Sequence, residues 1–100
     1  MMWIDFATIN RAALTHLPAL LRRWLPEGRL DGREYTSCNP MRTDRRPGSF
    51  KINVETGCWA DFATGDKGGD VVSLAAYLAG IGQADAAHKL ASMLGLESRP

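Results

Sequence analysis

The fold of this chain is decided by residues 49–70, which read SFKINVETGCWADFATGDKGGD. At the start of this stretch apolar and polar side chains alternate, with Phe50 and Ile52 on one face, as in a half-buried strand. Glu-Thr-Gly at 55–57 is typical of a tight turn, and residues 58–62 then read as the partner strand. The stretch therefore predicts an antiparallel hairpin.

The second strand of this hairpin has two different faces. Alternation places Cys58, Ala60 and Phe62 on one face and Trp59 and Asp61 on the other. We expect Phe62 to be packed inside. Trp59, on the opposite face, either belongs to the core, as most of the aromatic side chains do, or is exposed. An exposed tryptophan near basic residues can stack on a nucleic-acid base, a contact worth about 1–3 kcal/mol.

A glycine-rich turn follows the hairpin and leads into an apolar, helix-like segment. Because glycine lets the backbone approach a ligand and a helix N-terminus presents free N–H groups, Lys67 with the backbone of Gly68 and Gly69 could hold a phosphate. Alternatively, the glycines only form a tight turn. Asp66 and Asp70 flank the turn and would repel an anion, which favours the structural interpretation. Asp70 also suits the first position of a helix.

The N-terminal part of the chain predicts two helices. Apolar residues lie three and four positions apart, as one face of a helix requires, and Asp5 is the expected N-cap. Pro18 is tolerated only in a first turn, so we expect one helix to end near Thr15 and a second to end near Leu25. Residues 27–32 read as a turn.

Together the segments predict an α+β fold in a single domain over residues 1–100. It comprises an N-terminal helical segment (1–26), a small antiparallel β-sheet (33–63) and two C-terminal helices (68–95). The chain has 100 residues, 45% hydrophobic and 23% charged, which is typical of one soluble globule. No apolar run approaches the roughly 20 residues of a membrane span, and no signal peptide is evident, so we expect a cytoplasmic protein without a membrane partner.

The charge of the chain is uneven although its net value is only +1. Residues 22–51 contain eight basic and four acidic side chains, a surplus of four positive charges. Such a segment suits contacts with the phosphates of a nucleic acid. A solvated, arginine-rich loop would have the same composition.

Catalytic and metal-binding patterns are not found. The serines and aspartates lack the context of a nucleophile or a metal-binding catalytic cluster, so an enzyme is not expected. Cys38, Cys58, His16 and His88 are scattered instead of forming the closely spaced pairs of a structural zinc site. We therefore expect two reduced thiols, no metal and no cofactor.

The order of parts resembles a known family. A strand, a polar loop, RPGSFKINVETGCWADF (46–62) and GDKGGDVVSLAAYLAG (65–80) are similar to the N-terminal zinc-binding domain of bacterial DNA primases. The likeness is closer to the variant at the front of primase-helicase proteins from phages, plasmids and integrated elements, and it covers residues 34–95. The Gly-Gly-Asp that opens a helix after an aromatic strand is its most specific part.

The sequence differs from that family at the positions of the zinc ligands. The resemblance places Cys38, Met41, Phe62 and Gly65 on the four ligand positions, so only one ligand remains. Because Met41 and Phe62 are large and apolar, we expect their packing to fill the place of the metal in a zinc-ribbon-like sheet.

The resemblance implies a function in recognition of single-stranded template. The chain would then be a nucleic-acid-binding domain, without catalysis of its own, in a primase or primase-helicase of a mobile element. Its partners would be single-stranded DNA or RNA and the primase or helicase domains of a longer protein. The alternative is a stand-alone protein-interaction or inhibitor module of a phage or plasmid. The expected nucleic-acid-binding residues are Arg42, Arg45, Arg46, Lys51, Trp59, Lys67, Gly68 and Gly69.

Overall fold

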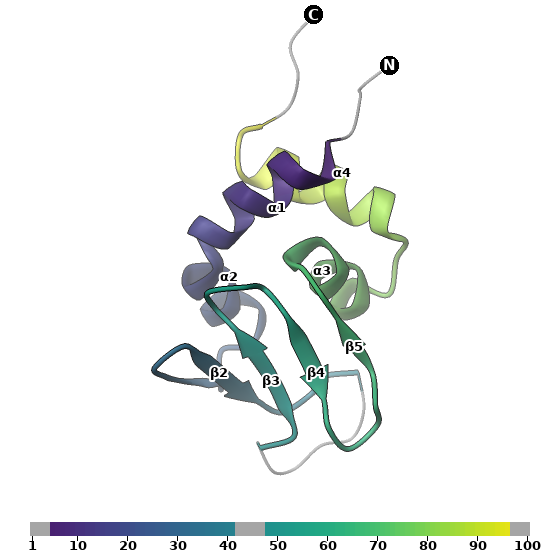
Figure 1. Ribbon diagram of the computed structural model, residues 1–100. Coiled ribbons are helices and arrows are strands. Elements are labelled where there is room, and N and C mark those ends of the chain that lie inside the picture. Colours follow the sequence, from purple (N-terminus) through teal and green to yellow (C-terminus); the bar gives the residue numbers. More distant parts are fainter. Residues whose placement is uncertain (1–4, 42–47, 97–100) are drawn as a thin grey trace, which may run out of the picture.

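The computed structural model describes residues 5–41 and 48–96, and in this part of the chain it shows an α+β fold (Figure 1). The helices precede and follow a five-stranded antiparallel sheet, which confirms the predicted class. In chain order the elements are α1 (Phe6–Thr15), α2 (Leu17–Trp24), β1 (Arg29–Asp31), β2 (Glu34–Ser37), β3 (Phe50–Asn53), β4 (Trp59–Asp61), β5 (Lys67–Gly68), α3 (Val71–Ala79) and α4 (Gln83–Met93).

The N-terminal helices begin and end where local chemistry predicts. Asp5 caps α1, since its Oδ1 accepts a hydrogen bond of 3.1 Å from the backbone N–H of Thr8. Pro18 lies in the first turn of α2, where its missing N–H has no partner to lose. The separation into two helices and the N-cap are thus confirmed. No helix among the described residues is long and apolar enough to cross a membrane.

The sheet is a meander in which each strand pairs with its chain neighbours, in the order β1-β2-β3-β4-β5. Two of these strands were not predicted. The segment expected to be a turn before residue 33 contains β1, which pairs with β2, and the glycine-rich turn contains β5, which pairs with β4. Both are edge strands of two or three residues, too short to produce a recognisable alternation.

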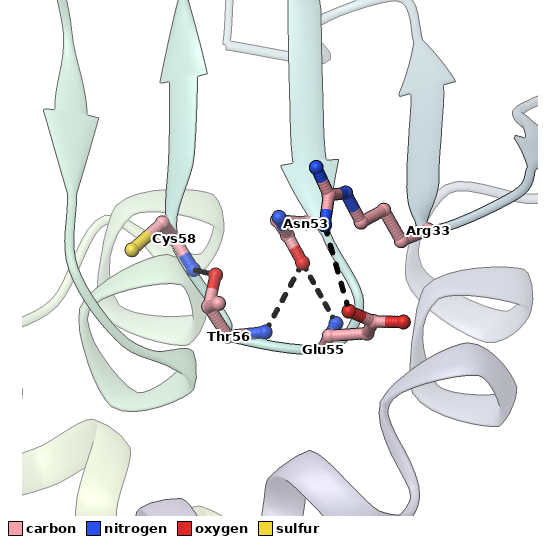
Figure 2. Close-up of polar contacts among 5 residues, drawn as sticks. All are labelled: Arg33, Asn53, Glu55, Thr56 and Cys58. Carbon is pink, nitrogen blue, oxygen red and sulfur yellow. Dashed lines mark hydrogen bonds and ion pairs between the residues drawn. The ribbon is translucent and has the colours of Figure 1, made fainter.

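The β3–β4 hairpin is confirmed, but its register differs from the prediction by one residue. Asn53 pairs with Cys58 through a backbone hydrogen bond of 2.8 Å, so Val54 belongs to the loop. The side chain of Asn53 holds this longer loop closed, because its Oδ1 accepts from the N–H groups of Glu55 (2.8 Å) and Thr56 (3.1 Å) (Figure 2). A shift of one residue reverses the face of every side chain on the second strand.

The observed exposure of three side chains overturns what was expected of them. Trp59 is 5% exposed and lies in the core opposite Ile52, whereas Phe62 is 72% exposed. Met41 is also largely exposed, at 47%. Phe62 and Met41 therefore do not fill the place of a metal, and the indole of Trp59 is not on the surface.

Helix α3 packs against the inner face of the sheet, where the ring of Tyr77 lies beside Phe50 and Trp59, and α4 packs against α3 and α1. Asp70 caps α3 through a capping box, accepting from Ser73 N–H at 2.8 Å, and Gly80 ends the helix in the left-handed conformation, with φ 68°. The helix start at Asp70 matches the prediction. The buried side chains of the helices and of the inner sheet face, including Phe50 and Ile52, form one hydrophobic cluster.

Candidate nucleic-acid interface

The outer face of the sheet carries a line of basic side chains. The register joins five residues across all five strands: Arg29, Thr36, Lys51, Ala60 and Lys67. We call these five residues the basic row. The residues next to them along the strands, such as Tyr35, Ile52 and Trp59, point into the core, so the row faces outward. Since neighbouring strands lie about 4.8 Å apart, the three cations are spaced at about 10 Å.

The side chain of Phe62 extends this face beyond the end of β4. Phe62 and Ala60 are two residues apart and therefore project from the same side of the strand. Together with Lys51 they line a shallow hollow of about 180 Å³ on the outer face. An aromatic ring that is 72% exposed beside a cation is the arrangement that a flat base and its phosphate require.

The charges of the basic row are only partly neutralised. Lys51 Nζ lies 3.1 Å from Glu34 Oε1, and both side chains are accessible to solvent. An exposed ion pair of this kind is worth about 0–1 kcal/mol and can exchange for a phosphate at little cost. Arg29 and Lys67 form no ion pair with any residue that the structure describes. Both of these cations are therefore available to an anion.

The glycine-rich turn packs closely against the side chain of Trp59. Gly68 is paired with Trp59 in the sheet, and a Cβ on Gly68 would overlap both the indole Nε1 and Ser73 Oγ. That Nε1 donates to Ser73 Oγ at 2.9 Å. The glycine therefore permits the close contact between β5, the indole ring and the start of α3, which supports the structural interpretation of this turn.

The N-terminus of α3 is likewise occupied by protein groups. The N–H of Ser73 donates to Asp70, and the N–H of Val72 donates to Asn10 Oδ1 at 2.9 Å. These two N–H groups of the helix N-terminus are therefore not available to a phosphate. A phosphate contact by Lys67 with the backbone of Gly68 and Gly69 stays a prediction.

The remaining predicted residues fall into two groups. Trp59 is held in the core by Ser73 and by Tyr77, whose ring centroid lies 4.7 Å away, so it offers no free face to a base. Arg42, Arg45 and Arg46 lie outside the described residues.

A cluster of polar side chains joins the two loops at which the family resemblance places zinc ligands. Asn39 Nδ2 donates to Asp61 Oδ2 (2.9 Å) and to the Tyr77 hydroxyl (2.8 Å), and that hydroxyl donates to Asp66 Oδ2 (2.7 Å). We call these four residues the polar clasp. Asn39 and Asp61 are buried. Among the described residues, no three histidine, cysteine, aspartate or glutamate side chains are grouped to hold a metal ion.

Two tyrosines are anchored by their hydroxyl groups. Tyr35 donates to the carbonyl of Leu25 at 2.6 Å and so ties β2 to the end of α2. Burial raises the pKa of the Tyr35 phenol, and it is also the main cause that raises the pKa of Tyr77. Both groups therefore remain neutral donors over the ordinary pH range.

Comparison with known proteins found no family model and no curated protein that matches this chain. The functional assignment therefore depends on the geometry of the outer sheet face and on the resemblance of the motifs.

The sequence prediction missed Arg29 and Phe62 in this interface. Arg29 was assigned to a turn, and Phe62 to the core. The signal that could have found Phe62 is Asn53, because an asparagine at the end of a strand favours a side-chain-closed turn and hence the longer loop. With that loop, Ile52 lies opposite Trp59, and Ala60 and Phe62 face solvent.

Proposed function

We propose that this chain is a non-catalytic domain that binds single-stranded nucleic acid on the outer face of its sheet. The observation that carries the proposal is the basic row with the exposed ring of Phe62 beside it. The resemblance to primase zinc-binding domains supports a role in template recognition by a cytoplasmic primase or primase-helicase of a mobile element.

The geometry of the outer sheet face suggests how a nucleic-acid strand would lie on it. The basic row crosses four strand spacings, or about 19 Å, so a bound nucleic-acid strand would run across the β-strands along this row. Phosphates would contact Arg29, Lys51 and Lys67, and one base would stack on Phe62. Contacts of this kind recognise backbone and ring faces, so we expect little sequence preference.

Arg42, Arg45 and Arg46 remain part of the proposal because of their place in the chain. They lie between β2 and β3, and Ser37 and Phe50, the residues that end and begin these strands, are paired in the register.

The test is fluorescence anisotropy of labelled single-stranded oligonucleotides of mixed composition, DNA and RNA, over a range of salt concentrations. The double variant Arg29→Ala/Lys67→Ala should weaken binding and reduce the slope of log K against log salt by about 1.4, from about 0.7 per phosphate contact. The matched control is Arg11→Ala/Arg23→Ala, which removes the same charge from exposed positions on α1 and α2 and should change the slope little.

A third variant, Phe62→Ala, separates stacking from charge. It should weaken binding by about 1–3 kcal/mol without a change of salt slope. Because the ring is exposed, the free energy of unfolding should stay within about 0.5 kcal/mol of the parent value. Absence of binding at low salt, or equal losses in the two double variants, would refute the proposed interface.

A second candidate function is a protein-interaction module. It is favoured by an apolar groove in the helical layer, between Trp24 and the two C-terminal helices. This groove shares no residue with the basic row.

A further inference from the structure

A groove of about 360 Å³ lies between the end of α2 and the helices α3 and α4. Its lining is almost entirely apolar and includes Trp24, Leu78, Ile81 and Leu90. Met93, at one end, is 47% exposed. An apolar hollow of this size is larger than the gaps that ordinary packing leaves and is typical of a binding surface.

The shape of the groove fits a helix better than a loop. Alanines at 75, 79 and 86 line it, and such short side chains let the backbone of a second helix come close. The eleven residues of α4 extend for about 16 Å at 1.5 Å per residue, which is the length of about three helical turns. A partner helix would thus place apolar side chains from two or three successive turns against the groove.

The charge of the groove defines the chemistry of the partner. Lys89 is the one charged residue in its lining, and it forms no ion pair with the described residues, although Asp85 lies one turn earlier on α4. Asp85 does not line the groove, so among the described lining residues the charge is the single positive charge of Lys89. At Lys89 the groove therefore favours a carboxylate of a partner over a basic group.

We propose that the groove is a docking site for an acidic amphipathic helix of another protein. The apolar residues of that helix, at positions i, i+3 or i+4 and i+7, would fill the hollow, and a carboxylate on its flank would pair with Lys89. The site is formed by the helices and not by the outer sheet face. The domain can thus hold a protein partner and a nucleic acid at the same time, and the proposal does not depend on nucleic-acid binding.

The test uses the whole chain and a displayed library of amphipathic helices as the probe. Each helix carries fixed leucines at i, i+4 and i+7 and random flanking residues. Selection on the protein should enrich aspartate and glutamate on one flank. Enriched peptides, synthesised with a fluorescent label, should bind the parent protein and lose about tenfold in affinity for Lys89→Glu, as expected for reversal of a close charge pair.

Two matched variants test the location. Ala79→Trp places a bulky ring in the groove at an exposed position and should abolish peptide binding, whereas Ala84→Trp makes the same substitution on α4 outside the groove and should leave it unchanged. Circular dichroism would establish that both variants fold. Oligonucleotide binding should be equal in the two, which separates this site from the sheet face.

Several results would overturn the proposal. The first is a selection that enriches no sequence, and the second is a selection that enriches basic residues on the flank of the helix. The third is a set of peptides that bind Ala79→Trp with the same affinity as the parent protein. A further contradicting result is a concentration-dependent dimer, seen by light scattering, that Ala79→Trp dissociates, because the groove would then be filled by a second copy of this chain.

Discussion

Replacement of Asn39 by alanine should destabilise the domain more than any exposed polar substitution. The residue is 1% exposed, and the hydrogen bonds of its side chain include those to Asp61 Oδ2, to the Tyr77 hydroxyl and from the N–H of Met41. The bond to the carboxylate is worth about 1.5–3 kcal/mol and each neutral bond about 1 kcal/mol. Asn39→Ala should therefore lower the free energy of unfolding by about 3–5 kcal/mol, a large part of the 5–15 kcal/mol typical of a domain.

Urea titration followed by circular dichroism measures this free energy. The control is Asn53→Ala, which also removes side-chain hydrogen bonds to backbone N–H groups, but at the β3–β4 turn, where water can replace them; we expect a loss of about 1 kcal/mol there. Tyr77→Phe should fall between the two, because Asn39 then keeps its bond to Asp61. If Asn39→Ala unfolds within 1 kcal/mol of the parent, the polar clasp does not join the two loops, and the reasoning is wrong.

The remaining predictions concern packing and pH. Gly68→Ala should cost about 1–3 kcal/mol because its methyl group overlaps the Trp59 indole, and thermal melting measures the loss; an unchanged melting temperature would contradict the close contact. The raised pKa values of Tyr35 and Tyr77 mean that the unfolded chain loses these protons first, so the stability present at neutral pH should fall as pH rises above about 10. In urea titrations, the free energy of unfolding of Tyr35→Phe should fall less between neutral and alkaline pH than that of the parent. An identical pH dependence in the two proteins would contradict a contribution of the Tyr35 phenol.

Several elements of the fold followed from the sequence because their causes are local. The cap at Asp5, the break before Pro18 and the helix start at Asp70 depend on groups no more than four residues apart. The existence of the β3–β4 hairpin also followed from alternation around a short turn. Lys51 and Lys67 of the candidate site were predicted. The alternation of apolar and polar residues in β3 indicates that Lys51 faces outward, and the polar sequence of the glycine-rich turn indicates that Lys67 is exposed.

The tertiary structure decided what depends on register and on distant contacts. The β3–β4 loop is one residue longer than expected, and the side chain of Asn53 stabilises it. Because side chains alternate along a strand, this one residue turns Trp59 into the core and Phe62 to the surface. The short edge strands β1 and β5 exist only through pairing with their neighbours, and that pairing puts Arg29 and Lys67 in line with Lys51.

The polar clasp shows the same limit most clearly. Asn39 is 22 residues from Asp61 and 38 from Tyr77, and no spacing in the sequence marks these residues as partners. They meet because the sheet register and the packing of α3 bring their loops together. Local sequence therefore determined the helices and the central hairpin, whereas the surface that we propose to bind nucleic acid was determined by which face of each strand the core buried.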